Sequence, residues 1–244
     1  MKQEFRRILS AFGFLTIFPL GNRGVTLEDL GKSTAYFPLV GLALGLILWG
    51  ADTLLGEILP YPARNALILT LLLLLSGGMH VDGLIDTFDG IGVHSSRERR
   101  LEVMSDSRVG SYGVLGVVIL FILEYAFLSS LDDDLRMKAL VLSPTLSRAA
   151  MVYAMASFPP AKGEGMGAAF KREVTARRAA FAFIFSLIVA AALGWRGILC
   201  MAGVMAFTLG LSFFLRRKLG GLTGDNYGAI NELSQMIALL IMTI

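Results

Sequence analysis

Long uncharged apolar runs are the feature that most restricts what this chain can fold into. A helix that crosses a hydrocarbon core of about 30 Å needs about 20 mostly apolar residues. Several stretches of the sequence approach or reach that length. With 55% hydrophobic and only 17% charged residues among 244, the chain is too apolar for an ordinary soluble domain of this length. We therefore expect an integral membrane protein.

The apolar stretches predict an all-α, polytopic transmembrane helical bundle of six or seven spans. The expected spans lie near residues 34–57, 65–81, 109–131, 139–158, 179–195, 197–215 and 227–244. The second span is short, because it offers only residues 65–79 without charge before His80. We expect its helix to continue past the lipid boundary and to carry the following aspartates with it.

The basic residues indicate an orientation, because Lys and Arg accumulate in short cytoplasmic loops. If the N-terminus is inside, 17 of the 22 Lys and Arg residues lie on the inner side and 4 on the outer side, with Arg148 inside the fourth span. This asymmetry predicts an inner N-terminus and an outer C-terminus. The net charge of +3 and the absence of a long basic run give no support for a nucleic-acid partner. The single cysteine, Cys200, excludes an intramolecular disulfide framework.

The N-terminal segment has the basic start and apolar continuation of a signal peptide, but no small-residue cleavage site follows. It ends at Pro19 and the GNRG of residues 21–24. Apolar and polar residues recur on opposite faces at helical spacing: Phe5, Ile8, Leu9 and Phe12 against Arg6, Arg7 and Ser10. This pattern predicts an amphipathic helix that lies at the cytoplasmic interface.

Three aspartates follow the short second span in HVDGLIDTFDG, residues 80–90. In a helix, Asp82, Asp86 and Asp89 share one face, where like charges repel. A hard divalent cation offsets this repulsion, and Mg²⁺ prefers carboxylate oxygens together with substrate phosphates. Gly83 and Gly90 flank the aspartates and leave room for a phosphate. The alternative is a solvated helix end that binds nothing.

Further polar residues are expected on the same side of the membrane. Arg108, near Asp106 in RRLEVMSDSRVGSYG, could hold a phosphate oxygen or simply anchor the next span. Gly165 lies in a glycine-rich segment that could close over a ligand or be a plain connector. Arg148, midway along a span, needs a carboxylate or a phosphate as a partner, because a lone charge in lipid costs several kcal/mol. His80 could carry a proton or be structural.

A second acidic box precedes the last predicted span, in LGGLTGDNYGAINEL. Asp225 and Glu232 are seven residues apart, so they share a face if this segment is helical. Thr223 and Asn226 lie in the same box. Ionisable groups at the edge of a membrane usually line a pathway or a site.

Five motifs, in this order and at these separations, resemble the cobalamin synthase family, the adenosylcobinamide-GDP ribazoletransferases. They are GGMHVDGLIDTFDG, RRLEVMSDSRVGSYG, SRAA, EGMGAAF and LGGLTGDNYGAINEL. FLTIFPL and YFPLVGLALG look like the N-terminal signatures of that family, so the resemblance covers nearly the whole chain. Departures are minor: Met79 stands where Leu is common, and Asn226 and Asn231 stand where relatives vary.

The resemblance implies a single catalytic membrane domain, residues 1–244, that performs the last step of the cobalamin nucleotide loop. The 3′-hydroxyl of α-ribazole or its 5′-phosphate attacks the corrinoid-side phosphorus of adenosylcobinamide-GDP, and GMP leaves. Mg²⁺ is the expected cofactor, in keeping with the chemistry of pyrophosphates. The expected location is the bacterial or archaeal cytoplasmic (inner) membrane, with the active site facing the cytoplasm. Membrane lipid and a second copy of the chain are further candidate partners.

The residue roles follow as expectations. The expected metal ligands are Asp82, Asp86 and Asp89, with Asp225 as a further ligand or general base and His80 as a candidate acid or base. The residues expected to contact substrate or phosphate are Gly83, Gly90, Asp106, Arg108, Arg148, Gly165, Thr223, Asn226 and Glu232.

Three other functions compete with this interpretation. Membrane prenyltransferases also bind Mg²⁺-diphosphate through spaced aspartates, but their box typically occurs twice, and the second box here has only Asp225. CDP-alcohol phosphotransferases begin their motif with Asp-Gly, as at Asp82-Gly83, yet require an Ala-Arg pair that DGLIDT lacks. A secondary transporter would place its carboxylates near the membrane midplane. Here they cluster at one face.

Overall fold

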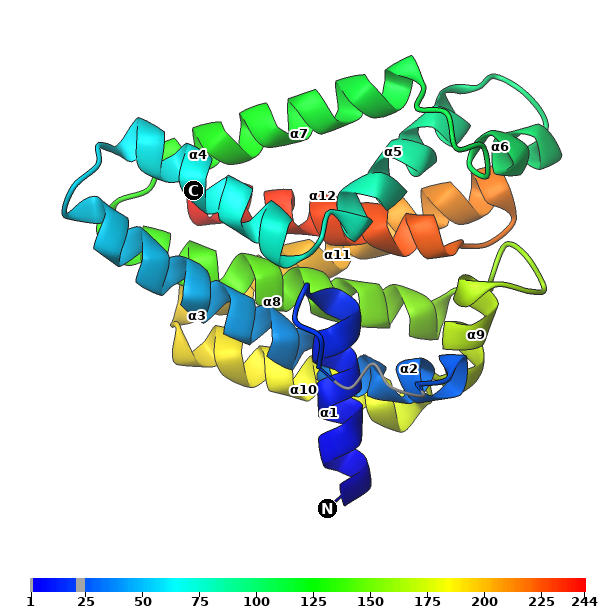
Figure 1. Cartoon of the computed structure of the whole chain (residues 1–244), viewed down its shortest axis with the longest axis horizontal. Helices are drawn as coiled ribbons and strands as arrows, with labels where there is room; N and C mark the ends of the chain where they lie inside the picture. The colour runs from blue at the N-terminus through cyan, green and yellow to red at the C-terminus, as the bar shows by residue number, and fades with distance from the viewer. Residues whose placement is uncertain (1, 21–24) are drawn as a thin grey trace.

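The computed structural model describes residues 2–20 and 25–244; the GNRG segment that ends the predicted N-terminal region therefore lies outside the described residues. The all-α prediction is confirmed, since the described residues form helices and no strand beyond one isolated bridge between Pro160 and Leu222 (Figure 1). The helices are α1 (Lys2–Leu15), α2 (Leu27–Ser33), α3 (Phe37–Gly56), α4 (Tyr61–Leu75), α5 (Met79–Gly92), α6 (Arg97–Val103), α7 (Ser111–Ser129), α8 (Asp133–Ser157), α9 (Met166–Glu173), α10 (Ala176–Ala192), α11 (Trp195–Leu219) and α12 (Gly224–Met242), with a short 3-10 helix η1 (Thr34–Tyr36) before α3.

Four to six segments are long and apolar enough to cross a membrane. Four of them are the continuous stretches Leu27–Gly56, Ser111–Ser129, Asp133–Ser157 and Trp195–Leu219. Two more arise if the bent pairs α4 with α5 and α9 with α10 each count as one span. The seventh predicted span corresponds to α12, which is not among them, because polar residues occupy its first half. The polytopic bundle is thus confirmed, with four to six candidate spans by length and composition among the described residues.

The second predicted span does not continue straight into the aspartates, and this expectation was wrong. Gly77 and Gly78 adopt left-handed backbone angles, with φ of +67° and +70°, which end α4 at Leu75. The chain turns by 92° before α5 begins. The backbone N–H of Ile17 donates to the carbonyl oxygen of Leu75 at 2.9 Å, so the segment after α1 braces this turn. The aspartates therefore lie on a separate helix.

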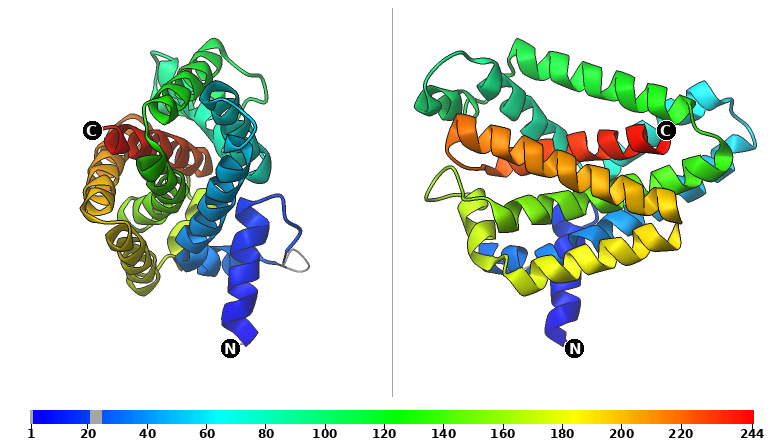
Figure 2. Two further views of the ribbon diagram at one scale, coloured as in Figure 1. Left: turned by 90° about the vertical axis from the view of Figure 1, so that its left-hand side faces the viewer. Right: turned by 180° about the vertical axis from the view of Figure 1, so that it is seen from behind.

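The centre of the bundle is α8, which is almost entirely buried and packs against α3, α10, α11 and α12 (Figure 2). Helices in membranes approach closely where small residues lie at the contact. At Gly41 of α3, a Cβ atom would lie 2.2 Å from the carbonyl oxygen of Pro144, and at Gly45 it would lie 2.8 Å from the Cα atom of Val141. The GLALG sequence of α3 thus allows a close approach of α3 to α8.

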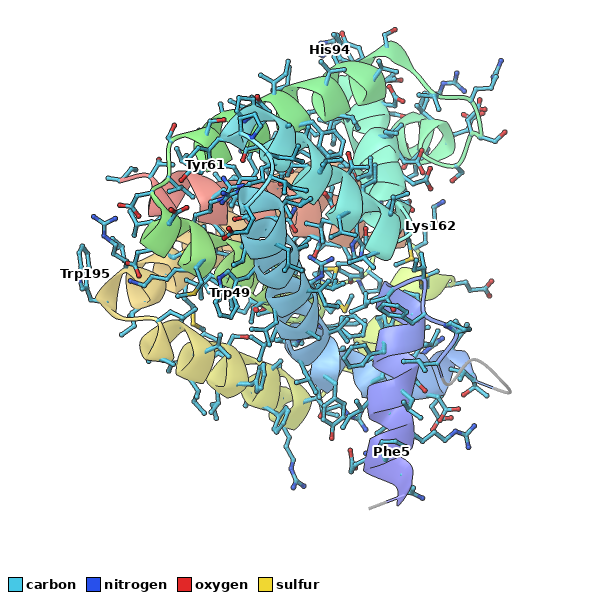
Figure 3. All side chains as sticks on the ribbon, turned by 60° about the vertical axis from the view of Figure 1, so that its left-hand side comes forward. Phe5, Trp49, Tyr61, His94, Lys162 and Trp195 are labelled. Atoms are coloured by element: carbon cyan, nitrogen blue, oxygen red, sulfur yellow. The ribbon has the colours of Figure 1, made fainter. Side chains whose placement is uncertain are left out.

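The N-terminal segment is a helix, as predicted, but it is only partly attached to the bundle. Ser10, Ala11 and Leu15 are buried in the C-terminal half of α1, whereas Phe5 is 63% exposed near its free end (Figure 3). The helix runs across the direction of the other long helices (Figure 1). Its placement at the membrane interface remains a prediction.

A buried ion cluster joins three helices at the end of the bundle where α3 ends and α4 begins. The carboxylate of Asp52 accepts two hydrogen bonds from Arg64, at 3.1 and 2.7 Å, and two from Arg136, at 2.8 and 2.6 Å. The ring of Tyr61 lies under both guanidinium groups, with centroid distances of 4.7 and 5.5 Å. Arg136 is 1% exposed and also donates to the carbonyl oxygen of Leu128. Every charge in the cluster is therefore paired.

Candidate functional site

A cavity of about 340 Å³ opens where α5, α9 and α12 begin, beside α1, α3 and α8. Apolar residues form much of its lining, including Phe14, Phe37, Met151, Met155 and Phe170. Its polar lining residues are His80, Asp82, Lys162, Glu164, Thr223, Asp225 and Tyr227. The two acidic boxes of the sequence, in which Asp82 and Asp225 are 143 residues apart, thus meet in one place.

Close packing of α5 on α12 brings the two acidic boxes together. At Gly83, a Cβ atom would lie 2.7 Å from the carbonyl oxygen of Asp225, and at Gly228 it would lie 3.0 Å from that of His80. The missing side chain of Gly83 lets two helix backbones touch, and its predicted role, space for a phosphate, stays a prediction. Gly90 lies outside the cavity, where its backbone contacts Met104 of the α6 region.

The three aspartates of α5 have different surroundings. Asp82 is exposed at the cavity, Asp86 is half-buried, and Asp89 is 7% exposed. The negative charges of Asp225, Asp82 and Asp89 all repel the charge of the Asp86 carboxylate. No ion pair within the described residues involves Asp82 or Asp86. Negative charge thus accumulates beside the cavity, and these two aspartates have no ion-pair partner among the described residues.

Asp89 points to α7. Its two carboxylate oxygens accept the backbone N–H groups of Gly110, at 2.7 Å, and Gly113, at 2.8 Å. A Cβ atom on either glycine would lie within 2.7 Å of this carboxylate. The Gly-Ser-Tyr-Gly sequence of residues 110–113 therefore binds the Asp89 carboxylate. It lies at the start of α7, where a helix leaves backbone N–H groups unpaired. In this arrangement Asp89 anchors a helix.

The polar residues at the start of α12 fix the position of Asp225. Thr223 and Asn226 form a reciprocal capping box, and the Thr223 hydroxyl also donates to the Asp225 carboxylate at 3.2 Å. The Asn226 side chain, fully buried, donates to the Thr87 hydroxyl of α5 at 2.9 Å. Asn226 does not line the cavity, so its predicted substrate contact is replaced by a structural role between the two helices.

A second group of polar residues is buried behind the cavity. Glu232, predicted to contact substrate, and Arg148, predicted to clamp phosphate, both lie here and outside the cavity lining. Arg148 Nη1 donates to Gln235 at 3.2 Å, and Gln235 donates to Glu124 at 3.0 Å. His80 Nδ1 lies 3.8 Å from Glu232 Oε1. Arg148 is thus linked to Glu124 through Gln235, away from the cavity, and its predicted contact with phosphate stays a prediction.

Arg108 and Asp106 are not brought to the cavity. They pair with each other on the exposed turn before α7, where Arg108 Nη2 lies 2.7 Å from Asp106 Oδ2. Hydrogen bonds from Arg108 lower the pKa of Asp106 to about 2. Gly165, by contrast, lines the cavity at the start of α9, with a φ of +97° and open space around it. It belongs to the cavity lining, and its predicted contact with substrate stays a prediction.

The donor set fits Mg²⁺ only in part. Within the described residues, no three His, Cys, Asp or Glu side chains form a group that could hold a metal ion by themselves. Proteins usually bind Mg²⁺ through one or two carboxylates, with substrate phosphates and waters as the other ligands. Asp82 and Asp225 meet at the cavity and Asp86 lies beside them. These oxygen donors suit an ion that arrives with a phosphorylated substrate.

Comparison with known proteins gives a match over nearly the entire chain. Residues 7–243 match the family model described as cobalamin-5-phosphate synthase. The chain belongs to the cobalamin-5-phosphate synthase family. It is 38% identical to the adenosylcobinamide-GDP ribazoletransferase of Geotalea daltonii, covering 95% of this chain and 94% of that protein. The proteins of the same name from Roseiflexus sp. and Clostridium acetobutylicum are 39% and 37% identical, covering 98% and 97% of this chain and 90% and 95% of theirs. No solved structure matches significantly.

Membership in the cobalamin-5-phosphate synthase family confirms the resemblance drawn from the motifs, and with it the assignment as an enzyme. Sequence reasoning missed part of the cavity. Lys162 is not among the residues predicted to contact substrate, yet its ammonium lies at the cavity 2.9 Å from the Ser105 hydroxyl. The glycines that follow it were the available signal. The apolar lining residues gave no signal, because Phe and Met in apolar spans look like any other lipid-facing or core residue.

Proposed function

We infer that the chain is an adenosylcobinamide-GDP ribazoletransferase. The observation that carries this conclusion is the family match over residues 7–243, which includes both acidic boxes that meet at the cavity. In the transfer, a bond forms between the ribose 3′-oxygen and the corrinoid-side phosphorus, the bond from that phosphorus to the bridging oxygen breaks, and GMP leaves. The family match leaves no observation that favours a prenyltransferase, a CDP-alcohol phosphotransferase or a transporter.

Asp82, Asp86 and Asp225 would hold Mg²⁺ together with the pyrophosphate of adenosylcobinamide-GDP. When bound, the ion would supply Lewis-acid polarisation of the phosphoryl oxygens and neutralise charge on the leaving phosphate. The local excess of negative charge on α5 and α12 supports this assignment. Asp89 stays a predicted ligand, but both of its oxygens already accept hydrogen bonds from α7. We therefore assign it to anchoring that helix.

The remaining polar lining would bind and orient the phosphates. The helices α9 and α12 both begin at the cavity, where Gly165, Gly167 and Gly224 belong to the lining. Backbone N–H groups at a helix start favour anions. Lys162 adds the only ammonium group of the cavity lining in the described residues. The proton of the attacking hydroxyl would pass to a carboxylate of the cavity lining. Asp225 is the candidate, because the Thr223 hydroxyl orients its carboxylate. His80 remains a second candidate for this proton transfer.

The protein is a membrane protein by its apolar helices, and we place it in the cytoplasmic membrane with the cavity facing the cytoplasm. The excess of basic residues on the predicted inner side supports this orientation. Nucleotide-activated substrates are made and used in the cytoplasm, which agrees with a cavity on that side. Either α-ribazole or its 5′-phosphate would serve as the acceptor.

The test is a product assay with purified protein in lipid. We expect release of GMP and formation of the joined corrinoid from adenosylcobinamide-GDP and α-ribazole, and loss of both when EDTA removes Mg²⁺. Asp82→Asn should lower turnover on the order of 100-fold, whereas Asp134→Asn, at the opposite end of the bundle, should leave it unchanged. Metal-independent turnover, or full turnover in Asp82→Asn, would contradict the assigned metal site.

A further inference from the structure

The apolar lining of the site cavity has no role in the phosphate chemistry above. Phe14 and Phe37 stack with ring centroids 6.0 Å apart, and Phe170 meets them edge-on at 5.6 and 6.2 Å. Met151 and Met155 of α8 add two thioether side chains that are 2% and 1% exposed. Aromatic and sulfur-containing side chains from α1, α3, α8 and α9 thus lie together beside the polar part of the cavity lining.

A cavity of this composition has the usual form of a small-molecule site. Such sites have mostly apolar walls and a few polar groups that fix orientation. An open space in a close-packed bundle also deprives its walls of dispersion contacts, which a ligand restores. Tyr227 belongs to the lining, and its hydroxyl is buried without a hydrogen-bond partner among the described residues. A buried hydroxyl of this kind is normally paired.

Size and polarity decide which part of the substrates fits. A cavity of about 340 Å³ is at the lower end of the range for small-molecule sites and suits a nucleoside of about 20 non-hydrogen atoms. The corrinoid is several times larger. Guanine carries several donors and acceptors, which walls of Phe and Met would leave unpaired at a cost. The dimethylbenzimidazole base of α-ribazole is planar, bicyclic and apolar, with one free ring nitrogen that accepts a hydrogen bond.

We propose that the apolar lining formed by Phe14, Phe37, Met151, Met155 and Phe170 is the subsite for the base of α-ribazole and selects an apolar bicyclic base. The proposal rests on the ribazoletransferase function inferred above. The methyl-bearing edge of the base packs on the methionines of α8, with which aromatic rings make favourable sulfur contacts. The ribose then lies toward Asp82 and Asp225, where the transfer takes place.

The first experiment truncates one wall residue and a matched control in the intact protein. Met155→Ala removes a buried side chain from the cavity, and Met201→Ala removes an equally buried one from α11, outside the cavity lining. We expect Met155→Ala to raise the KM for α-ribazole about tenfold, from lost apolar contact, and to leave the KM for adenosylcobinamide-GDP nearly unchanged. Met201→Ala should change neither KM.

The second experiment removes the same contact from the ligand. The riboside of benzimidazole, which lacks both methyl groups, should have a KM about tenfold above that of α-ribazole with the unmodified enzyme. With Met155→Ala the KM values of the two acceptors should differ less. The side chain that contacts the methyl groups is already absent, so the two losses of contact do not add.

Two results would overturn the proposal. A raised KM for adenosylcobinamide-GDP alone in Met155→Ala would place part of the corrinoid in the cavity. Unchanged KM values for both substrates, in a variant that still turns over, would leave the cavity without a substrate. If Met155→Ala does not fold, as judged by its thermal unfolding, Phe170→Leu gives the same readout with a smaller loss of volume. Turnover by the unmodified enzyme tests the function separately.

Discussion

At the scale of single residues, identical side chains on one helix face serve different purposes. The spacing of the α5 aspartates predicted one carboxylate stripe, and the helix is present. However, Asp82 lines the cavity, whereas the Asp89 carboxylate accepts hydrogen bonds from N–H groups at the start of α7. Helical periodicity gives the common face of the aspartates, but the partners of each one depend on segments more than 20 residues away. Those partners could not be predicted from the spacing.

The two roles separate in a pair of isosteric variants. Asp89→Asn keeps one acceptor oxygen but loses the charge that two N–H groups of α7 contact, so the protein should be destabilised by about 1–3 kcal/mol. Asp82→Asn removes a charge that has no partner in the fold, so its stability should not fall. Thermal unfolding in detergent, measured beside turnover, checks both expectations. A destabilised Asp82→Asn together with a fully stable Asp89→Asn would reverse the assignment.

Lys162 offers a second test at this scale. Its ammonium is the cation of the cavity lining, so Lys162→Ala should lower kcat/KM for adenosylcobinamide-GDP by on the order of tenfold or more, through weaker phosphate binding. Lys138→Ala, at the far end of the bundle, is the matched control and should have no effect. Steady-state kinetics at constant ionic strength make the comparison. An equal effect of both changes would assign the loss to charge in general.

At the scale of elements, the sequence predicted the helices well and their junctions poorly. Apolar runs of 17 to 23 residues predicted α7, α8, α10 and α11 close to their observed positions. The turn between α4 and α5 was missed, although Gly77 and Gly78 were visible, because a glycine pair is tolerated inside helices as well. The ion cluster around Asp52 was missed because its members come from three helices, and hydropathy carries no information about their pairing.

The close contact of α5 with α12 gives an element-scale prediction. In Gly83→Ala, the new methyl group would overlap the backbone of Asp225, so the helices must separate. A shift of about 1 Å in reacting groups can cost 100-fold in rate, and we expect turnover to fall by at least tenfold. Gly50→Ala is the control, since nothing lies within 4 Å of that position in α3. Normal turnover in Gly83→Ala would mean that the relative position of the two acidic boxes is unimportant.

The ion cluster gives the other prediction at this scale. Asp52→Ala leaves Arg64 and Arg136 buried without their carboxylate, which typically costs 3–5 kcal/mol. Asp134→Ala breaks only the exposed pair with Lys138 and should change stability by less than about 1 kcal/mol. Thermal unfolding of both variants measures the difference. If the two variants unfold at the same temperature, the buried cluster contributes no more to stability than an exposed ion pair does.

At the scale of the whole molecule, the two ends of the bundle differ in composition. Tyr61 and Trp195 lie at the end away from Lys162 (Figure 3), and both are exposed, at 42% and 69%. Aromatic side chains of this type favour the membrane–water interface. The basic helix α6 and the basic end of α11 lie at the cavity end instead (Figure 1). This polarity follows from the loop charges, so it was accessible from the sequence once the spans were placed.

The orientation can be tested because the only cysteine, Cys200, is fully buried and should not react in the folded protein. Ser107 and Ser130 are both exposed, the first on the turn before α7 at the cavity end and the second at the other end of the same helix. If the cavity faces the cytoplasm, a membrane-impermeant maleimide added to intact cells should label Ser130→Cys at once and Ser107→Cys only after permeabilisation. The opposite pattern would put the carboxylates of α5 and α12 on the outer face, away from the nucleotide substrates that the transfer requires. Labelling of both variants in intact cells would instead mean that α7 does not separate the two sides of the membrane.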